Sequence, residues 1–160
     1  MGFHRTWLTA GDFLKEGVSM RQPRKKLRVF VVDDEFIIAS TLGLILCNKG
    51  FDAISFNGPL EALEAARTLA PDLLISDVVM PGISGIELAI RIQAQCPHCK
   101  VLLFSGQAAT AGLLEAARAK GYNFEILSKP VHPTDLLARI AEAIAPSSPA
   151  SQEAQTMLGA

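Results

Sequence analysis

The sequence predicts an α/β protein in which five strands form one parallel sheet with helices on both faces. Two observations lead to this fold class. Short runs of β-branched and apolar residues alternate with longer segments of helical spacing, and this alternation repeats five times between residues 27 and 145. The strand runs are also almost continuously apolar, which indicates strands buried on both faces of a parallel sheet.

The predicted strands and helices follow one another in strict order. The strands are the runs at residues 27–32, 52–56, 72–76, 101–105 and 124–128. The helices are the segments at 35–48, 60–70, from Ser84 onward, 111–120 and from His132 onward. Right-handed crossovers leave few arrangements for five such units, and we expect the flavodoxin-like strand order 2-1-3-4-5.

Local signals mark the ends of these helices. Gly50 follows the first helix, Pro71 closes the second and Gly121 ends the fourth. Ser84 and Glu87 form a capping-box pattern, in which each side chain is expected to accept the other's backbone N–H. The last helix is expected to begin near His132-Pro133, because proline suits a first helical turn.

Length and composition exclude several classes of protein. The chain has 160 residues, a net charge of −1 and three cysteines. The charge balance gives no sign of direct nucleic acid binding, and no apolar run approaches the ~20 residues that span a bilayer. An odd number of cysteines is not a disulfide framework. We therefore expect a cytoplasmic protein without membrane insertion.

Three regions follow from the periodicity. Residues 27–145 are expected to form one domain. Residues 1–26 and 146–160 lack periodic apolar spacing, and we expect them to be a mobile N-terminal extension and a disordered C-terminal tail.

Polar side chains stand at the ends of four predicted strands. They are Asp33 and Asp34 after the first strand, Asp77 after the third, Ser105 after the fourth and Lys129 after the fifth. Strands one and three are neighbours in the predicted order, so three carboxylates meet at one edge. Their repulsion disfavours full ionisation, and an all-oxygen site selects a hard cation such as Mg²⁺. With a hydroxyl and an ammonium opposite, these groups describe a phosphoryl site with an aspartate nucleophile.

A structural interpretation competes with the functional one for each residue alone. An aspartate at a strand end is commonly a turn residue or a helix cap. The joint placement of all five polar residues is what predicts function.

At these residues the sequence resembles the receiver domain of bacterial two-component response regulators, in particular the stand-alone, chemotaxis-regulator-like type. The motifs "VFVVDDE", "DLLISDVVMPGISGIEL", "VLLFSG" and "ILSKP" carry the resemblance, which covers about residues 27–145. They are specific because identity, order and placement all agree. The resemblance implies a phosphoprotein of a phosphorelay that is not an enzyme, beyond its own phosphorylation and dephosphorylation.

The resemblance implies a role for each site residue. Asp77 looks like the phosphoacceptor. Asp33 and Asp34 look like the acidic pair that holds Mg²⁺, Asp34 directly and Asp33 through water. Asp77 and the backbone carbonyl of Val79 complete the protein's ligands.

The remaining site residues correspond to groups that bind the transferred phosphoryl. Ser105 is expected to donate a hydrogen bond to one phosphoryl oxygen and Lys129 to pair with another. The Lys129-Pro130 peptide bond is expected to be cis, as in the family.

The resemblance also implies partners. A phosphohistidine on a sensor histidine kinase or a histidine phosphotransfer protein is the expected donor. The residues after 145 are too few for an output domain, so we expect a stand-alone module that signals by contact with a downstream protein. The fourth helix, fifth strand and fifth helix are the expected docking surface for that protein or for a second copy of the chain.

One departure from the family pattern leaves an alternative open. Ile126 stands where receivers carry Tyr or Phe, and Phe124 lies two residues earlier on the same face. The loop after Ser105 and the helix that follows are then the parts expected to move. The alternative is an interaction module that works independently of phosphorylation.

A second alternative is thiol chemistry at Cys96-Pro97-His98-Cys99. A thioredoxin-type pair precedes a helix whose N-terminus lowers the pKa of a thiol, whereas this pair follows a helix and precedes a strand. A zinc site needs further ligands, and no second pair exists. We expect a surface loop whose thiols are dispensable, with a redox protein using Cys96 and Cys99 as the less favoured interpretation.

Overall fold

A computed structural model of the chain describes residues 25–106 and 111–145. Strands and helices alternate throughout, as the sequence predicts. They are β1 Arg28–Val32, α1 Phe36–Asn48, β2 Asp52–Phe56, α2 Pro59–Ala66, β3 Leu73–Asp77, α3 Gly85–Gln95, β4 Lys100–Ser105, α4 Ala111–Ala119, β5 Glu125–Ser128 and α5 Pro133–Ile144. The tails expected at residues 1–26 and 146–160 lie outside the described residues, apart from Lys25 and Lys26.

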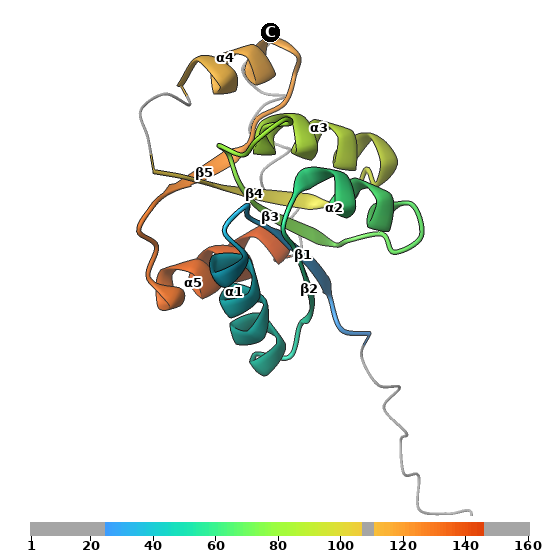
Figure 1. Ribbon diagram of the computed structural model, residues 1–160, viewed down its shortest axis with the longest axis vertical. Helices are drawn as coiled ribbons and strands as arrows, with labels where there is room; N and C mark the ends of the chain where they lie inside the picture. The colour runs from blue at the N-terminus through green and yellow to red at the C-terminus, as the bar shows by residue number, and fades with distance from the viewer. Residues whose placement is uncertain (1–24, 107–110, 146–160) are drawn as a thin grey trace, which may run out of the picture.

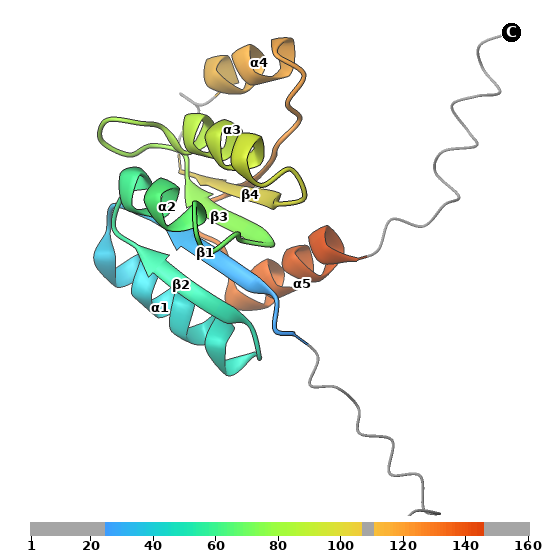
Figure 2. The same ribbon diagram turned by 90° about the vertical axis from the view of Figure 1, so that its right-hand side faces the viewer.

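The five strands form one parallel sheet in the order β2-β1-β3-β4-β5, which confirms the predicted flavodoxin-like arrangement. Helices α1 and α5 cover one face, and α2 and α3 cover the other (Figures 1 and 2). Because all strands run the same way, their carboxyl ends share one edge of the sheet. Val32 of β1 lies beside Ser76 of β3, and Asp77 lies beside Phe104 of β4.

Two apolar cores lie on opposite faces of the sheet. Side chains alternate along each inner strand, so Phe30 and Val32 enter one core while Val29 and Val31 enter the other. The first core contains Leu74, Val78, Leu88 and Ile92 and packs under α2 and α3. The second contains Ile75, Leu102, Leu136 and Ile140 and packs under α1 and α5. The outer strands β2 and β5 are only partly buried.

Helix α4 is the most weakly anchored of the helices. Ala117 is its one buried residue, whereas α3 buries five of its residues. It stands beside α3, above the end of the sheet that holds β5 (Figure 1). Few buried apolar contacts imply a low free energy for local displacement.

The helix ends differ from the predictions in two places. Helix α2 ends at Ala66, four residues before the predicted Ala70, because the chain continues in a turn that includes a hydrogen bond from the Thr68 N–H to the Ala65 carbonyl. The capping box of α3 forms on one side only. The Ser84 hydroxyl accepts the Glu87 N–H at 3.2 Å, but the Glu87 carboxylate pairs with Arg91 instead.

Other end signals are confirmed. Gly50 and Gly121 adopt positive φ values of 93° and 87°, which glycine tolerates and which end α1 and α4. His132 caps α5, and Pro133 occupies its first turn. In the described parts of the chain, no helix is both long and apolar enough to cross a bilayer.

Candidate phosphoryl and metal site

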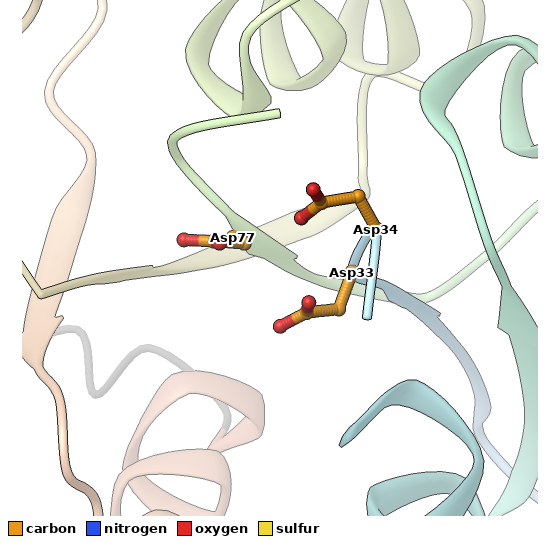
Figure 3. Close-up of side chains that lie close together, drawn as sticks. All are labelled: Asp33, Asp34 and Asp77. Atoms are coloured by element: carbon orange, nitrogen blue, oxygen red, sulfur yellow. The ribbon is translucent and has the colours of Figure 1, made fainter. Parts of the chain in front are cut away.

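Three carboxylates meet at the carboxyl edge of the sheet. Asp33 and Asp34 follow the last residue of β1, and Asp77 is the last residue of the neighbouring strand β3. Carboxylate oxygens of the three residues lie within 4.8 Å of one another. Figure 3 shows the side chains of Asp33 and Asp34 extending from β1 toward the side where Asp77 lies. Within residues 25–106 and 111–145, this is the one group of three or more such side chains placed to hold a metal.

The three aspartates differ in burial and in partners. Asp33 is buried, and its two oxygens accept the Glu35 N–H at 2.9 Å and the Lys129 ammonium at 3.1 Å. Asp77 is largely buried and accepts the same ammonium at 3.1 Å. Asp34 is exposed. It is therefore the carboxylate that faces solvent and any ion arriving from it.

Lys129 bridges two of the carboxylates. Burial by itself lowers the pKa of this lysine, but its hydrogen bonds to Asp33 and Asp77 and their charges outweigh burial and raise the pKa above its ordinary value. The ammonium is thus charged at neutral pH. Three carboxylates and one ammonium leave a formal charge of −2 in this small volume.

The donor set fits a hard divalent cation. Mg²⁺ takes oxygen ligands and balances two negative charges, and carboxylates are among its preferred protein ligands. Asp33, Asp34 and Asp77 would hold it. Val79, whose carbonyl is the expected fourth protein ligand, follows Val78 in a segment tied to β4 by the Val78 N–H to Phe104 carbonyl bond of 2.9 Å.

The other predicted residues lie at the ends of β4 and β5. Ser105 is buried at 6% exposure and pairs in register with Ser128. The Lys129 N–H donates to the Ser105 carbonyl at 2.9 Å, so the lysine and the serine are held on adjacent strands. The Lys129-Pro130 bond is cis, as predicted. The structure thus brings all the predicted side chains to the carboxyl edge.

Two features of the site were missed from the sequence. The Lys129 ammonium was expected to meet a phosphoryl oxygen, and the structure pairs it with Asp33 as well as Asp77. The Asp33 carboxylate also accepts the N–H two residues on, which fixes its orientation. The sequence did contain a signal for the second feature, because aspartate commonly bonds a backbone N–H two residues later.

The Cys-x-x-Cys segment lies between α3 and β4, at the opposite edge of the sheet. The expectation of a surface loop is wrong for Cys99, which is 2% exposed and belongs to the first core. Burial, followed by the nearby Cys96 and Asp72, raises the pKa of Cys99 to about 12. Burial also raises the pKa of Cys96. Thiols that stay protonated are poor nucleophiles and poor metal ligands, which argues against redox or zinc chemistry here.

Comparison with known proteins agrees with this geometry. Residues 29–141 match the response regulator receiver domain. The chain belongs to the response regulator receiver domain family. Receiver domains act with histidine kinases in two-component signalling, so the family supports a signalling function for the chain rather than membership of a known catalytic family.

Curated relatives extend beyond the receiver. The chain is 32% identical over 127 residues to the transcriptional regulatory protein FixJ of Bradyrhizobium diazoefficiens, and this match covers 79% of the chain and 61% of FixJ. It is 36% identical over 115 residues to the transcriptional regulatory protein CreB of Escherichia coli, covering 70% of the chain and 48% of CreB. The chain thus matches about half to three fifths of each of these relatives.

Two solved structures align with the chain over nearly their own whole length. A CheY-like receiver domain protein of Methanospirillum hungatei aligns with a TM-score of 0.66 and 26% identity, covering 73% of the chain and 92% of that protein. The chemotaxis protein CheY4 of Vibrio cholerae aligns with a TM-score of 0.65 and 27% identity, covering 74% of the chain and 99% of CheY4.

Proposed function

We propose that this receiver accepts a phosphoryl group on Asp77 from a phosphohistidine of a sensor kinase or phosphotransfer protein, and signals by contact with another protein. The observation that carries the proposal is the imbalance at the carboxyl edge, where three carboxylates face one ammonium beside a buried hydroxyl. A structural cluster would be balanced by its own chain, whereas a site for Mg²⁺ needs this excess of negative charge, and the bound ion would then neutralise the incoming phosphoryl group.

The positions of the side chains support the following reaction. An Asp77 carboxylate oxygen attacks the phosphorus in line, the new O–P bond forms as the P–N bond of the phosphohistidine breaks, and the electron pair returns to the imidazole. Bound Mg²⁺ supplies neutralisation of the negative charge. Lys129, already 3.1 Å from Asp77, pairs with a phosphoryl oxygen, and Ser105 donates its hydroxyl to another.

Phosphorylation is tested by intact mass after incubation with acetyl phosphate and Mg²⁺. The wild-type chain should gain one phosphoryl group that is stable in acid and labile in base. Asp77→Asn keeps the shape and removes the nucleophile, so it should gain none. Asp72→Asn, at the opposite edge of the sheet, is the matched control and should label like the wild type. Equal labelling of all three chains would contradict the proposal.

An apolar groove beside the site suits the phosphoryl donor. The groove, about 570 Å³ in volume, lies between α1 and the segment that joins β5 to α5, and Lys129 lines it. Its other lining residues are almost all apolar, among them Ile38, Leu42 and Val131. Ile37 also lines it and is 78% exposed. Lys129 lines the groove and also pairs with Asp77, so the groove lies next to the phosphoacceptor. We therefore propose that an apolar helix of the histidine-bearing partner binds in this groove.

A charged residue introduced into the groove tests whether the groove binds the phosphoryl donor without changing the chemistry at Asp77. Ile37→Glu should slow transfer from a phosphorylated histidine kinase that labels the wild type, and leave labelling by acetyl phosphate unchanged. Leu60→Glu is the control, because Leu60 is 66% exposed on α2, on the other face of the sheet. Equal slowing by both variants would place the docking surface elsewhere.

One observation favours the second candidate, a module that works without phosphorylation. Ile126 packs against the first core next to Phe124, so an aliphatic side chain fills the position where an aromatic ring would report the phosphoryl group. The loosely packed α4 then remains as the responsive element. Of the loop predicted to move, residues 106–112, residues 107–110 lie outside the described residues.

Hydrogen exchange with and without beryllofluoride decides between the two candidates. Under the main proposal, amides of residues 111–121 change their protection when the mimic binds. Ile126→Tyr should alter that response without changing labelling of Asp77. Changes confined to the residues around Asp77 would favour the module that works without phosphorylation.

A further inference from the structure

Ser76 is a polar residue inside an apolar core. It is fully buried in β3, between Leu74 and Val78, which both belong to the first core. Its hydroxyl donates to the backbone carbonyl of Asp77 at 2.9 Å. A buried hydroxyl is costly unless it is hydrogen-bonded, so this bond accounts for a serine at a position where the strand otherwise carries Leu and Val.

Gly85, the first residue of α3, touches the same carbonyl. A methyl group at Gly85 would collide with the Asp77 carbonyl and would lie 2.9 Å from the Ser76 hydroxyl. The colliding atoms belong to the backbone of β3, which cannot move aside as a flexible side chain could. Glycine is needed here for close approach, and its own N–H donates to the Val78 carbonyl at 2.9 Å.

The backbone that follows the phosphoacceptor is therefore held at three points. The Asp77 carbonyl accepts from Ser76, the Val78 N–H donates to Phe104, and the Val78 carbonyl accepts from Gly85. These bonds fix the peptide planes Asp77–Val78 and Val78–Val79. The Asp77 carboxylate branches from the chain just before the first plane and the Val79 carbonyl follows just after the second, so the positions of both groups depend on those planes.

We infer that Ser76 and Gly85 are positioning residues that hold Asp77 and the Val79 carbonyl in the geometry required for Mg²⁺ binding and phosphoryl transfer. The inference rests on the proposed function. Neither residue touches the phosphoryl group, and both act through the backbone of Asp77 and Val78.

The chain provides a matched control for this contact. Gly43 of α1 packs against Ser55 of β2 so closely that a methyl group on Gly43 would collide with the Ser55 hydroxyl. Ser55 also donates to a backbone carbonyl, that of Ala39, at 2.8 Å. The second contact thus joins a helical glycine to a strand serine as the first does, but it holds α1 on β2 rather than the segment after Asp77.

The test compares Ser76→Ala and Gly85→Ala with Ser55→Ala and Gly43→Ala. For each folded variant, the Mg²⁺ dissociation constant is measured by calorimetry, and the rate of acetyl phosphate labelling is measured at saturating Mg²⁺. Denaturant unfolding gives the loss of stability. Since small misplacements of a reacting group are costly, Ser76→Ala should slow labelling about fivefold and Gly85→Ala should weaken Mg²⁺ binding about tenfold or more. The Ser55 and Gly43 variants should stay within about twofold of the wild type in both constants.

The outcomes are distinct. If Ser76→Ala and Ser55→Ala lose similar stability and neither changes labelling or Mg²⁺ binding, Ser76 and Gly85 serve packing only and the inference fails. If Gly85→Ala does not fold, the comparison of Ser76→Ala with Ser55→Ala still tests the inference. A wild-type chain that binds Mg²⁺ but is never labelled would overturn the proposed function, and the four Mg²⁺ constants would then still test the inference.

Discussion

The two edges of the sheet carry similar residues and differ in how their charges are balanced. At the amino edge, Arg28 pairs with Asp52 at 3.0 Å, and the Arg28 N–H donates to the Asp72 carboxylate at 2.7 Å. At the carboxyl edge, Asp33 and Asp77 share Lys129 and Asp34 is exposed. Aspartates alone therefore do not mark a site. A carboxylate with its own partner serves structure, whereas a cluster with too few cations attracts one from solution.

The cysteines at the amino edge also show that a residue pattern alone does not identify a functional site. Cys-x-x-Cys is the pattern in the sequence that most suggests chemistry, yet the structure raises the pKa of both thiols and buries Cys99 in the core. Reactivity follows from the surroundings of a group and not from its spacing along the chain.

Removing carboxylates should show the largest difference between the edges. Asp34→Asn should weaken Mg²⁺ binding by at least about tenfold, as expected for loss of a ligand, and Asp33→Asn by less, because Lys129 already neutralises part of its charge. Asp52→Asn at the amino edge should leave the dissociation constant unchanged. Calorimetric titration measures all three. A larger loss in Asp33→Asn would invert the roles of the pair.

Removing the Lys129 ammonium, which Asp33 and Asp77 share, should increase the excess of negative charge at the carboxyl edge. Lys129→Met leaves the Asp33 and Asp77 carboxylates without the hydrogen bonds of the ammonium, so the metal-free protein should lose about 1–3 kcal/mol of unfolding free energy. Mg²⁺ should then bind several times more tightly, because the competing charge is gone. Arg28→Met at the amino edge should reduce stability slightly and leave Mg²⁺ affinity as it was. Unchanged affinity in Lys129→Met would show that lysine and metal do not compete.

The thiols should matter for stability alone. Cys99→Ser places a hydroxyl in an apolar core and should cost about 1–3 kcal/mol of unfolding free energy, while Cys96→Ser, at a partly exposed position, should cost less. Neither change should affect labelling of Asp77. Stoichiometric zinc in the purified protein that disappears in the Cys96→Ser and Cys99→Ser double variant would instead support a metal site at the amino edge.

The stability should also depend on pH through Cys99. The folded-state pKa is raised from an ordinary value of 9.0 to about 12, so the unfolded state loses its proton first. The associated stability is therefore present below the unfolded pKa and is lost as pH rises toward the folded one.

Wild type should lose about 1.4 kcal/mol more than Cys99→Ala between about pH 7.5 and pH 10, because the unfolded thiol then titrates over about one unit beyond its pKa. Lys129 does not disturb the comparison, because its raised pKa affects stability only above its ordinary value of about 10.4, and it is present in both proteins. Parallel pH profiles for the two proteins, obtained by denaturant unfolding, would show that the Cys99 thiol is exposed in solution.

The order of the elements and the edge at which the site forms could both be predicted from the sequence. Alternating apolar periods are local signals, and parallel strands with right-handed crossovers leave little freedom in strand order. Once the order is set, residues at strand ends must meet, which is why Asp33, Asp77 and Lys129 could be assigned to one site.

Which side chains and backbone groups contact one another could not be predicted in the same way. The pairing of Lys129 with Asp33, the burial of Cys99 and the approach of Gly85 to the Asp77 carbonyl all join residues from different elements. These contacts depend on how closely α3 and β5 pack against the inner strands, and many weak contacts together determine that packing. Neither residue spacing nor periodicity along the chain contains that information.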